Sequence, residues 1–306
     1  MKERVFVIIV TYNASKWVDT CFTSLRKSSL PVEVVVIDNG STDNTISLIQ
    51  TNFPEVDLVI SNENLGFGKA NNIGLKKALD ASADYVFLLN QDAWVDFDTI
   101  EKLVLAQKTN PEFGVLSPIH LTGNGEQMDA NFYDCFTEKN QNKSLRNILS
   151  APSIQAFDIR FVNAALWLIS KKCLEEVGGF DSLFYHYGED KNYIHRVKYH
   201  GFKLGVVPAA FGYHDRQTRG ARSLKQLLQK EITMFYSNTT DPALNPKEQT
   251  DKYIKEKRKR ALKKILKGNI IEGVKYLNTT VEMRRKISLV EESIRRNKVK
   301  GAHYIS

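Results

Sequence analysis

The sequence has only three cysteines among its 306 residues, and Cys21, Cys135 and Cys173 lie far apart. An odd number of widely spaced cysteines argues against a disulfide framework and against a zinc site. No stretch reaches the roughly 18 to 20 consecutive apolar residues of a membrane-spanning helix. The N-terminal run "RVFVIIVTYN" lacks a small-residue cleavage site, so it predicts a strand and not a signal peptide. We therefore expect a protein of the cytoplasm.

Basic residues are scarce in the first two thirds of the chain and concentrated in the last third. Residues 1–215 hold 20 lysines and arginines and 26 acidic residues, a net charge of −6, whereas residues 216–306 hold 23 and 9, a net charge of +14. A charge run usually marks only a solvated face, but so sharp a boundary suggests a segment with its own anionic partner.

The first 120 residues alternate between short β-branched runs and segments with helical spacing. The runs are nearly continuous in apolar residues, as expected for strands covered on both faces, and they are 5–12, 32–39, 56–61, 85–90 and 113–119. The alternation predicts an α/β fold with a mostly parallel, doubly wound sheet and helices on both faces. Ligands bind at the carboxyl ends of such strands. The polar residues there, Thr11–Asn13, Asp38–Ser41, Asn62–Asn64 and Asn90–Asp92, are therefore candidates for the site.

The pattern changes after residue 120. The polar, aperiodic segment 120–160 is either mobile or an active-site flap. "GEDKNYIHRVKYHG" predicts a helix that begins with two carboxylates, and "FKLGVVP" and "AAFGYHD" predict two further short strands. From Arg222 on, the chain is expected to be helical.

Three stretches of the first half carry candidate chemistry, each with a plain structural alternative. Asp38 in "VIDNGSTDNT" could accept hydrogen bonds from a base or ribose, or the stretch could be a solvated loop. The glycine-rich segment 62–75 suits a diphosphate near Lys69 but lacks a dinucleotide fingerprint. Asp92 in "LLNQDAWV" could bind a divalent metal or could end a strand in an Asx-turn.

Two further candidates lie in the second half. One carboxylate of Glu189 and Asp190 could deprotonate a hydroxyl, but acidic residues at a helix start are common and this alternative is favoured for the pair alone. His214 in "GYHD" is a single histidine, and single histidines are more often structural than ligands.

Taken in order, these pieces resemble the family 2 glycosyltransferases with the GT-A fold, in particular a bacterial rhamnosyltransferase-like subgroup that builds surface polysaccharides. The resemblance covers about residues 4–215 and rests on an ordered set of motifs. These are "VIIVTYN", "VVVIDNGSTDNT", "NENLGFGKANNIGL", "LLNQDA", "VNAALWLISKKCLEEVGGFDSLFYHYGEDKNYIHRVKYHGFKLGVVP" and "YHD".

The resemblance implies a role for each matching position. Asp190 would be the catalytic base of an inverting transfer to an acceptor hydroxyl, and Asp92 with His214 would bind Mn²⁺ or Mg²⁺. Trp167 and Glu189 are candidates on the acceptor side. The expected nucleotide-sugar-binding residues are Thr11, Tyr12, Asn13, Asp38, Gly66, Lys69, Asn72, Asn90 and Gln91. The donor would be a UDP- or dTDP-sugar, and the acceptor a saccharide or a lipid-linked saccharide.

Two positions depart from the family pattern, and two other functions stay open. Asn90 replaces the first aspartate of a D-x-D element, as is usual in the subgroup, and Asn71 replaces an arginine. A sugar nucleotidyltransferase would carry a basic, glycine-rich signature after the first strand, which "VTYNASKW" lacks. In a catalytically silent scaffold that only binds nucleotide-sugar, both asparagines would be signs of decay.

We expect a catalytic domain at 1–220, with a nucleotide-binding half (1–119) and an acceptor half (120–220), followed by a basic helical extension at 221–306. The segment 255–267 holds eight lysines and arginines around a partial apolar stripe. It predicts an interfacial helix at an anionic membrane, and the equally weighted alternative is a helix packed on the core or on a second subunit. No nucleic-acid-binding motif accompanies the charge.

Overall fold

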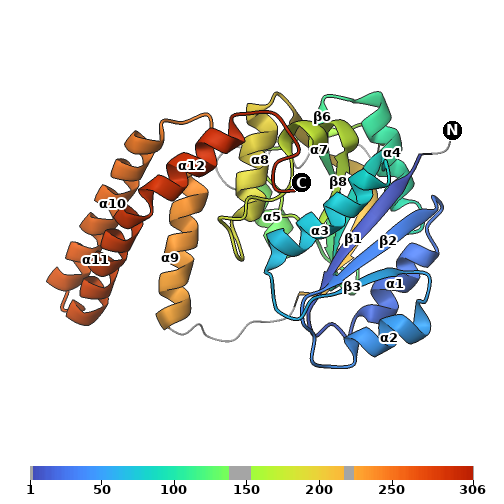
Figure 1. Cartoon of the computed structure of the whole chain (residues 1–306), viewed down its shortest axis with the longest axis horizontal. Helices are drawn as coiled ribbons and strands as arrows, with labels where there is room; N and C mark the ends of the chain where they lie inside the picture. The colour runs from blue at the N-terminus through green and yellow to red at the C-terminus, as the bar shows by residue number, and fades with distance from the viewer. Residues whose placement is uncertain (1–2, 138–152, 217–223, 306) are drawn as a thin grey trace.

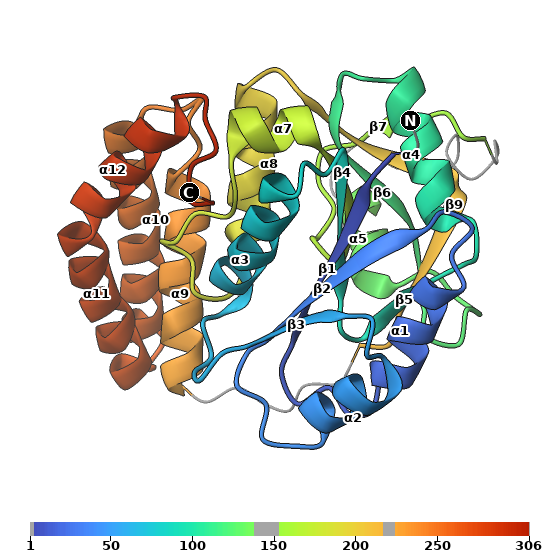
Figure 2. The same cartoon turned by 45° about the vertical axis from the view of Figure 1, so that its right-hand side comes forward.

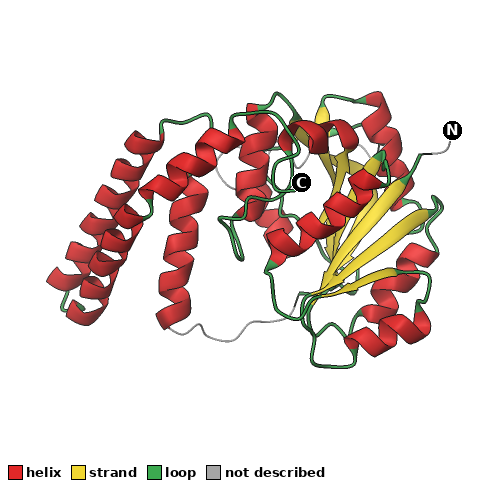
Figure 3. Cartoon of the chain, in the orientation of Figure 1, coloured by secondary structure: helices red, strands yellow, loops and turns green. Residues whose placement is uncertain are grey.

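The computed structural model describes residues 3–137, 153–216 and 224–305. A nine-stranded sheet forms the centre of this part of the chain, and helices cover both of its faces (Figures 1 and 3). The strands are β1 (Val5–Thr11), β2 (Val32–Asp38), β3 (Asp57–Ile60), β4 (Tyr85–Asn90), β5 (Ala93–Val95), β6 (Phe113–Thr122), β7 (Phe157–Asp158), β8 (Leu166–Ser170) and β9 (Lys203–His214). The predicted α/β fold with two covered faces is confirmed.

The sheet has a parallel half and a mixed half. Its strand order is β3-β2-β1-β4-β8-β6-β9-β5, and β7 pairs with β9 outside this path. Neighbours from β3 to β4 are parallel, whereas β8 runs antiparallel to both β4 and β6. The parallel pairing that the sequence predicts is present from β3 to β4 and again between β6 and β9, and the antiparallel β8 lies between these two parts. Because β8 is reversed, its start lies at the edge where β1, β2 and β4 end.

The two short strands predicted before Asp215 are one strand, β9. β9 is one continuous strand, but its register with β6 shifts where Pro118 and Ile119 of β6 meet it. The last residues of β9 also pair with β5, which places His214 opposite Ala93. This register brings His214 next to Asp92.

Alternating side chains of each strand pack into different cores. In β1, Val5, Val7 and Ile9 face α1, α2 and α4, whereas Phe6 and Ile8 face α3, α5, α7 and α8. These helices are α1 (Val18–Arg26), α2 (Thr45–Asn52), α3 (Phe67–Asp80), α4 (Thr99–Thr109), α5 (Ala130–Thr137), α7 (Lys171–Val177) and α8 (Glu189–Tyr199). The near-continuous apolar runs of the sequence follow from this burial on both sides.

The C-terminal part of the described chain is helical, as predicted. It comprises α9 (Leu224–Thr239), α10 (Pro246–Leu266), α11 (Ile270–Arg285) and α12 (Ile287–Asn297), which pack around a separate apolar cluster that includes Phe235 and Met283. The extension lies beside α8, with the α10–α11 hairpin farthest from the sheet (Figures 1 and 2). Within the described residues, none of the helices combines the length and apolar composition that a membrane crossing needs. The predicted boundary at 220–221 lies outside the described residues.

Candidate active site

The ends of β1 and β2 are joined by a buried carboxylate. The sheet register pairs Thr11 with Asp38, and the Thr11 hydroxyl donates to Asp38 Oδ2 at 2.8 Å. The backbone N–H of Ser41 donates to Oδ1 at 2.8 Å, and its hydroxyl donates to Oδ2 at 2.6 Å. Asp38 is fully buried. Its carboxylate therefore orders the loop after β2, and its expected contact with a base or ribose stays a prediction.

The exposed groups at this edge belong to the residues after β1. Gln91 accepts from the Tyr12 N–H at 2.6 Å and donates to the Tyr12 carbonyl at 3.2 Å, so the ends of β1 and β4 are clamped together. Asn13 has a left-handed φ of 50°, which asparagine tolerates better than most residues, and its Oδ1 accepts from the Thr42 N–H at 2.8 Å. The Tyr12 side chain remains 47% exposed and is available to a ligand.

The glycine-rich loop is tied to the segment that leads into α8. Gly66 has a φ of 79°, and a Cβ there would collide with the Tyr185 carbonyl oxygen, so only glycine fits. Asn72 donates to the Phe180 carbonyl at 2.8 Å and accepts from the Phe180 N–H at 2.7 Å. Asn72 thus links α3 to the backbone at Phe180, and its expected role in donor binding stays a prediction. Lys69, in the first turn of α3, is exposed.

Asp92 and His214 form a pair at the end of β4. His214 Nε2 lies 3.1 Å from Asp92 Oδ1, and the Asp215 N–H donates to the Asp92 carbonyl at 2.8 Å. His214 is 3% exposed, and among the described residues its Nδ1 has no hydrogen-bond partner. Asn90, the other polar residue of this turn, is half-buried and donates its N–H to the Ala165 carbonyl at 2.9 Å.

The pair fits part of a metal site. Two ligands at right angles, each about 2.1 Å from an ion, are about 3 Å apart, close to the Asp92–His214 separation. Carboxylate oxygen suits Mg²⁺ and Mn²⁺, which are commonly held by one or two carboxylates together with substrate phosphates. Across residues 3–137, 153–216 and 224–305, no group of three His, Cys, Asp or Glu residues could hold an ion. The remaining ligands would therefore come from a bound substrate or water.

The acidic pair follows an unusual backbone turn. Tyr187 has a φ of 69° and Gly188 a φ of 84°, directly before Glu189 begins α8. A bulky residue in the left-handed region is rare, and such strained residues cluster at functional sites. Asp190 is half-buried, and its Oδ1 accepts from the Lys191 N–H at 2.7 Å.

Burial changes the acidity of both carboxyls. Loss of solvation raises the pKa of Asp190 above its ordinary range. Burial, and then the charge of Asp190, raise the pKa of Glu189. Glu189 is only 5% exposed, and its Oε2 has no hydrogen-bond partner among the described residues. It is therefore the carboxyl of the pair that favours the neutral form, and Asp190 is the more accessible base.

Both acceptor-side candidates are buried. Trp167 is fully buried and packs against Phe180 and Tyr193, with ring centroids 6.5 and 5.8 Å away. Trp167 and Glu189 are thus internal residues in this structure, and their expected place on the acceptor side stays a prediction. An alternating or apolar pattern does not distinguish a tryptophan that covers a site from one that fills the core.

The charge of Asp190 acts on a residue that is connected by hydrogen bonds to the end of β4. The charge of Asp190 raises the pKa of the Cys135 thiol, though less than burial does, and this thiol also hydrogen-bonds with the backbone of Asn163. The Asn163 carbonyl accepts from the Ala165 N–H at 2.9 Å, and Ala165 bonds with Asn90. Ser41 was among the predicted polar residues after β2, whereas Asn163 and Cys135 were not predicted, because no spacing signal marks them.

These features define a class of protein. Polar loops at the carboxyl ends of β1, β2 and β4, with a strained acidic helix start linked to the same edge, are typical of an α/β enzyme whose ligand binds there. The model of glycosyl transferase family 2 matches residues 6–177, more than half of the chain. The chain belongs to this family and is a glycosyltransferase.

Known relatives agree with this assignment. The chain is 26% identical to N-acetylglucosaminyl-diphospho-decaprenol L-rhamnosyltransferase of Mycobacterium tuberculosis, over 71% of this chain and 77% of that protein. It is also 26% identical to dTDP-rhamnosyl transferase RfbF of Shigella flexneri, over 68% of each chain. The crystal structure of S. aureus TarS 1–349 in complex with UDP-GlcNAc aligns with a TM-score of 0.58 and 17% identity, over 96% of this chain and 89% of that one. The predicted GT-A fold and rhamnosyltransferase-like resemblance are confirmed.

Proposed function

We propose that this chain is an inverting glycosyltransferase that moves a sugar from a nucleotide-sugar donor to a hydroxyl of a growing surface polysaccharide or a lipid-linked acceptor. Relatives named for dTDP-rhamnosyl transfer and for a decaprenol diphosphate acceptor support these substrate classes, as does a structural neighbour crystallised with UDP-GlcNAc. The observation that carries the proposal is Asp190, a half-buried carboxyl with a raised pKa in the first turn of α8, directly after the strained backbone at Tyr187 and Gly188.

The chemistry follows from these positions. Asp190 accepts the proton of the acceptor hydroxyl while that oxygen attacks the anomeric carbon. The bond from this carbon to the diphosphate oxygen breaks on the opposite face, and its electron pair leaves with the nucleoside diphosphate. Because the acceptor oxygen attacks on one face and the diphosphate leaves from the other, the configuration of the anomeric carbon is inverted. Tyr12 and Lys69, exposed at the same edge, are the side chains available to the donor.

Replacing the base tests this mechanism most directly. We expect Asp190→Asn to lower the rate of transfer by about 10² to 10⁴-fold, because the amide cannot take up the proton. Donor binding, measured as the rise in Tm with UDP- or dTDP-sugars, should persist. Asp251→Asn, an exposed change on α10, is the matched control and should leave both quantities unchanged. Transfer by Asp190→Asn at the parental rate would show that another group is the base.

A divalent ion is the second part of the proposal. Asp92 and His214 would hold Mn²⁺ or Mg²⁺, which would supply positive charge near the departing diphosphate. EDTA should abolish transfer and Mn²⁺ or Mg²⁺ should restore it. Asp92→Asn should weaken Mn²⁺ binding measured by EPR in the presence of UDP or dTDP. Full activity of the wild-type protein in EDTA would contradict this part alone.

A further inference from the structure

The turn between α10 and α11 exposes large apolar side chains from both helices. Leu266 is 87% exposed and Ile271 is 74% exposed, with Ile270 at 59%, Leu262 at 52% and Val274 at 44%. We call these five residues the hairpin tip. Exposed apolar residues that gather in one place mark an interaction site more often than scattered ones do.

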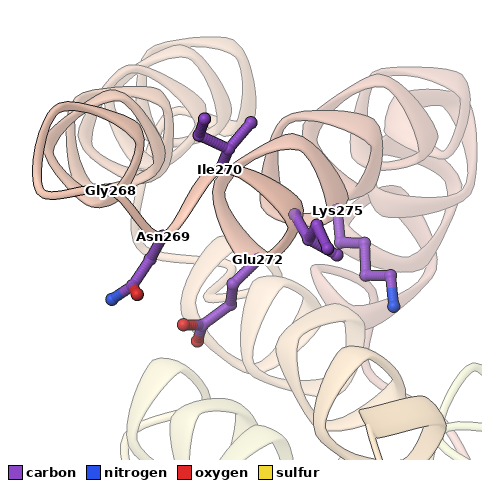
Figure 4. Close-up of a pocket in the computed structure, with 6 residues that line it drawn as sticks. Gly268, Asn269, Ile270, Glu272 and Lys275 are labelled. Carbon is purple, nitrogen blue, oxygen red and sulfur yellow. The ribbon is translucent and has the colours of Figure 1, made fainter.

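The tip is not needed to hold the hairpin together. A Cβ on Gly273 would collide with Ile265, and Ala261 is fully buried, so the two helices approach closely along their inner faces. Figure 4 shows Gly268, Asn269 and Ile270 at the turn, with Glu272 and Lys275 beside them around a shallow pocket. Internal packing is therefore complete without the outward-facing side chains of the tip.

Basic side chains surround the tip on α10. Three of the eight in 255–267 are engaged within the protein. Lys257 is buried against Glu231, Arg258 donates to the Thr280 hydroxyl at 3.3 Å, and Lys264 bonds with Glu272 at 2.6 Å. Five are exposed: Lys255, Lys259, Arg260, Lys263 and Lys267. Lys259, Lys263 and Lys267 are spaced four residues apart and thus follow one face of the helix next to Leu262 and Leu266.

We propose that the hairpin tip docks on the surface of an anionic lipid bilayer. Leu266, Ile270 and Ile271 would enter the boundary between headgroups and acyl chains, where apolar side chains leave water. The exposed lysines and arginine would face anionic headgroups, whose negative potential attracts basic residues near the surface. The contact thus involves the end of a helical hairpin and not the length of the basic helix expected from the sequence.

A second copy of the chain fits this surface less well. In a two-fold symmetric dimer the same patch contacts itself, which would bring the Lys259, Lys263 and Lys267 faces of two copies together. Like charges at such a contact oppose association, whereas an anionic surface is attracted. The tip and the carboxyl edge of β1–β3 both lie at the lower side of the molecule in Figures 1 and 2, so docking leaves the site near the bilayer.

Cosedimentation of the full chain with vesicles tests the proposal without donor or acceptor. We expect binding to vesicles of phosphatidylcholine with phosphatidylglycerol, and weak binding to phosphatidylcholine alone. Leu266→Ser with Ile271→Ser should lower the partition coefficient by about tenfold or more, since it removes the largest apolar contacts. Lys263→Glu with Lys267→Glu should lower binding to anionic vesicles by about tenfold or more. The control Leu105→Ser changes a residue on α4 that is 43% exposed and should have no effect.

Two results would overturn the inference. One is equal vesicle binding by the wild type and both double variants. The other is a wild-type dimer, measured by light scattering, that the Leu266→Ser/Ile271→Ser variant dissociates while neither protein binds vesicles. A cooperative thermal unfolding transition near the wild-type Tm shows that the variants are folded. Because the inference goes beyond the proposed transfer reaction, the vesicle result stands or falls separately from the Asp190→Asn result.

Discussion

The two sides of the site are built in different ways. The edge formed by β1 and β2 is held by groups close to the strand ends, with Thr11, Asp38 and Ser41 bonded across one parallel register. The helix that bears Asp190 is instead held by the C-terminal extension. Lys191 bonds with Asn238 at 3.1 Å, and Asn192 bonds with Thr240 at 3.1 Å, both at the end of α9.

The approach to α8 is held from even farther along the chain. Asp181, 3% exposed, accepts from Ser293 at 2.6 Å and from Asn297 at 3.0 Å on α12. Asn297 in turn accepts from the Tyr304 hydroxyl at 2.9 Å. The guanidinium of Arg196, buried in α8, lies over the Tyr304 ring at 5.4 Å. The extension thus holds the helix of Asp190, the proposed base, whereas bonds at the strand ends hold the loops that are proposed to bind the donor.

The largest effect is expected on the strand-end side. Asp38→Ala removes the acceptor for three hydrogen bonds at a buried carboxylate, so we expect a loss of about 3 kcal/mol in the free energy of unfolding and loss of the donor-induced rise in Tm. Urea denaturation measures the first quantity. Asp57→Ala, which breaks an exposed ion pair with Lys77, should cost at most about 1 kcal/mol. If both variants lose the same small amount of unfolding free energy, the bonds among Thr11, Asp38 and Ser41 do not hold this edge.

A smaller effect is expected where the extension holds α8. Asn297→Ala removes the bonds to Asp181 and Tyr304, and it should cost about 1 to 3 kcal/mol because buried polar partners are left unpaired. If the network positions Asp190, kcat measured at temperatures well below the melting range should fall. The donor-induced rise in Tm should stay unchanged. Asn278→Ala, exposed on α11, is the control. If Asn297→Ala lowers Tm but keeps the parental kcat, the network stabilises the fold and does not position Asp190.

The pH dependence separates the two carboxyls of the base-bearing helix. Because the pKa of Asp190 is raised, transfer should fall on acidification at a higher pH than an ordinary aspartate would give. The raised pKa of Glu189 means that the folded state binds its proton more tightly, so the stability from this group is present at low pH and is lost as pH rises through the raised value. Glu189→Gln should therefore gain stability relative to the wild type as pH increases, measured as Tm against pH. A constant difference in Tm would contradict the raised pKa of Glu189.

The sequence predicted the first half of the fold well and the second half less well. Strands β1 to β4 are near-continuous apolar runs between helices with clear periodicity, and each was expected within a residue or two of its place. The reversal of β8 and the continuity of β9 were not predicted. Strand direction and register are set by pairing partners far along the chain, which local periodicity does not contain.

The candidate site shows the same division. The pairing of Asp92 with His214 was expected from their order in a resemblance, and the structure brings them within 3.1 Å. Trp167, Glu189 and Asn72 were expected at the ligand, and in this structure Trp167 and Glu189 are buried while Asn72 is bonded to the Phe180 backbone. Residue type and position at an element's end indicate a candidate, but exposure depends on which elements pack over it.

The sequence by itself determined the family, the alternating strands and helices, the polar residues at the strand ends and the basic helical extension. All of these are properties of residue type and spacing within short segments. Only the tertiary structure decided that Asp38 is internal, that the extension holds the helix of Asp190 and that Leu266 and Ile271 face outward at the hairpin tip. These depend on contacts between residues up to more than a hundred positions apart, since burial and hydrogen-bond partners are fixed when distant elements pack together.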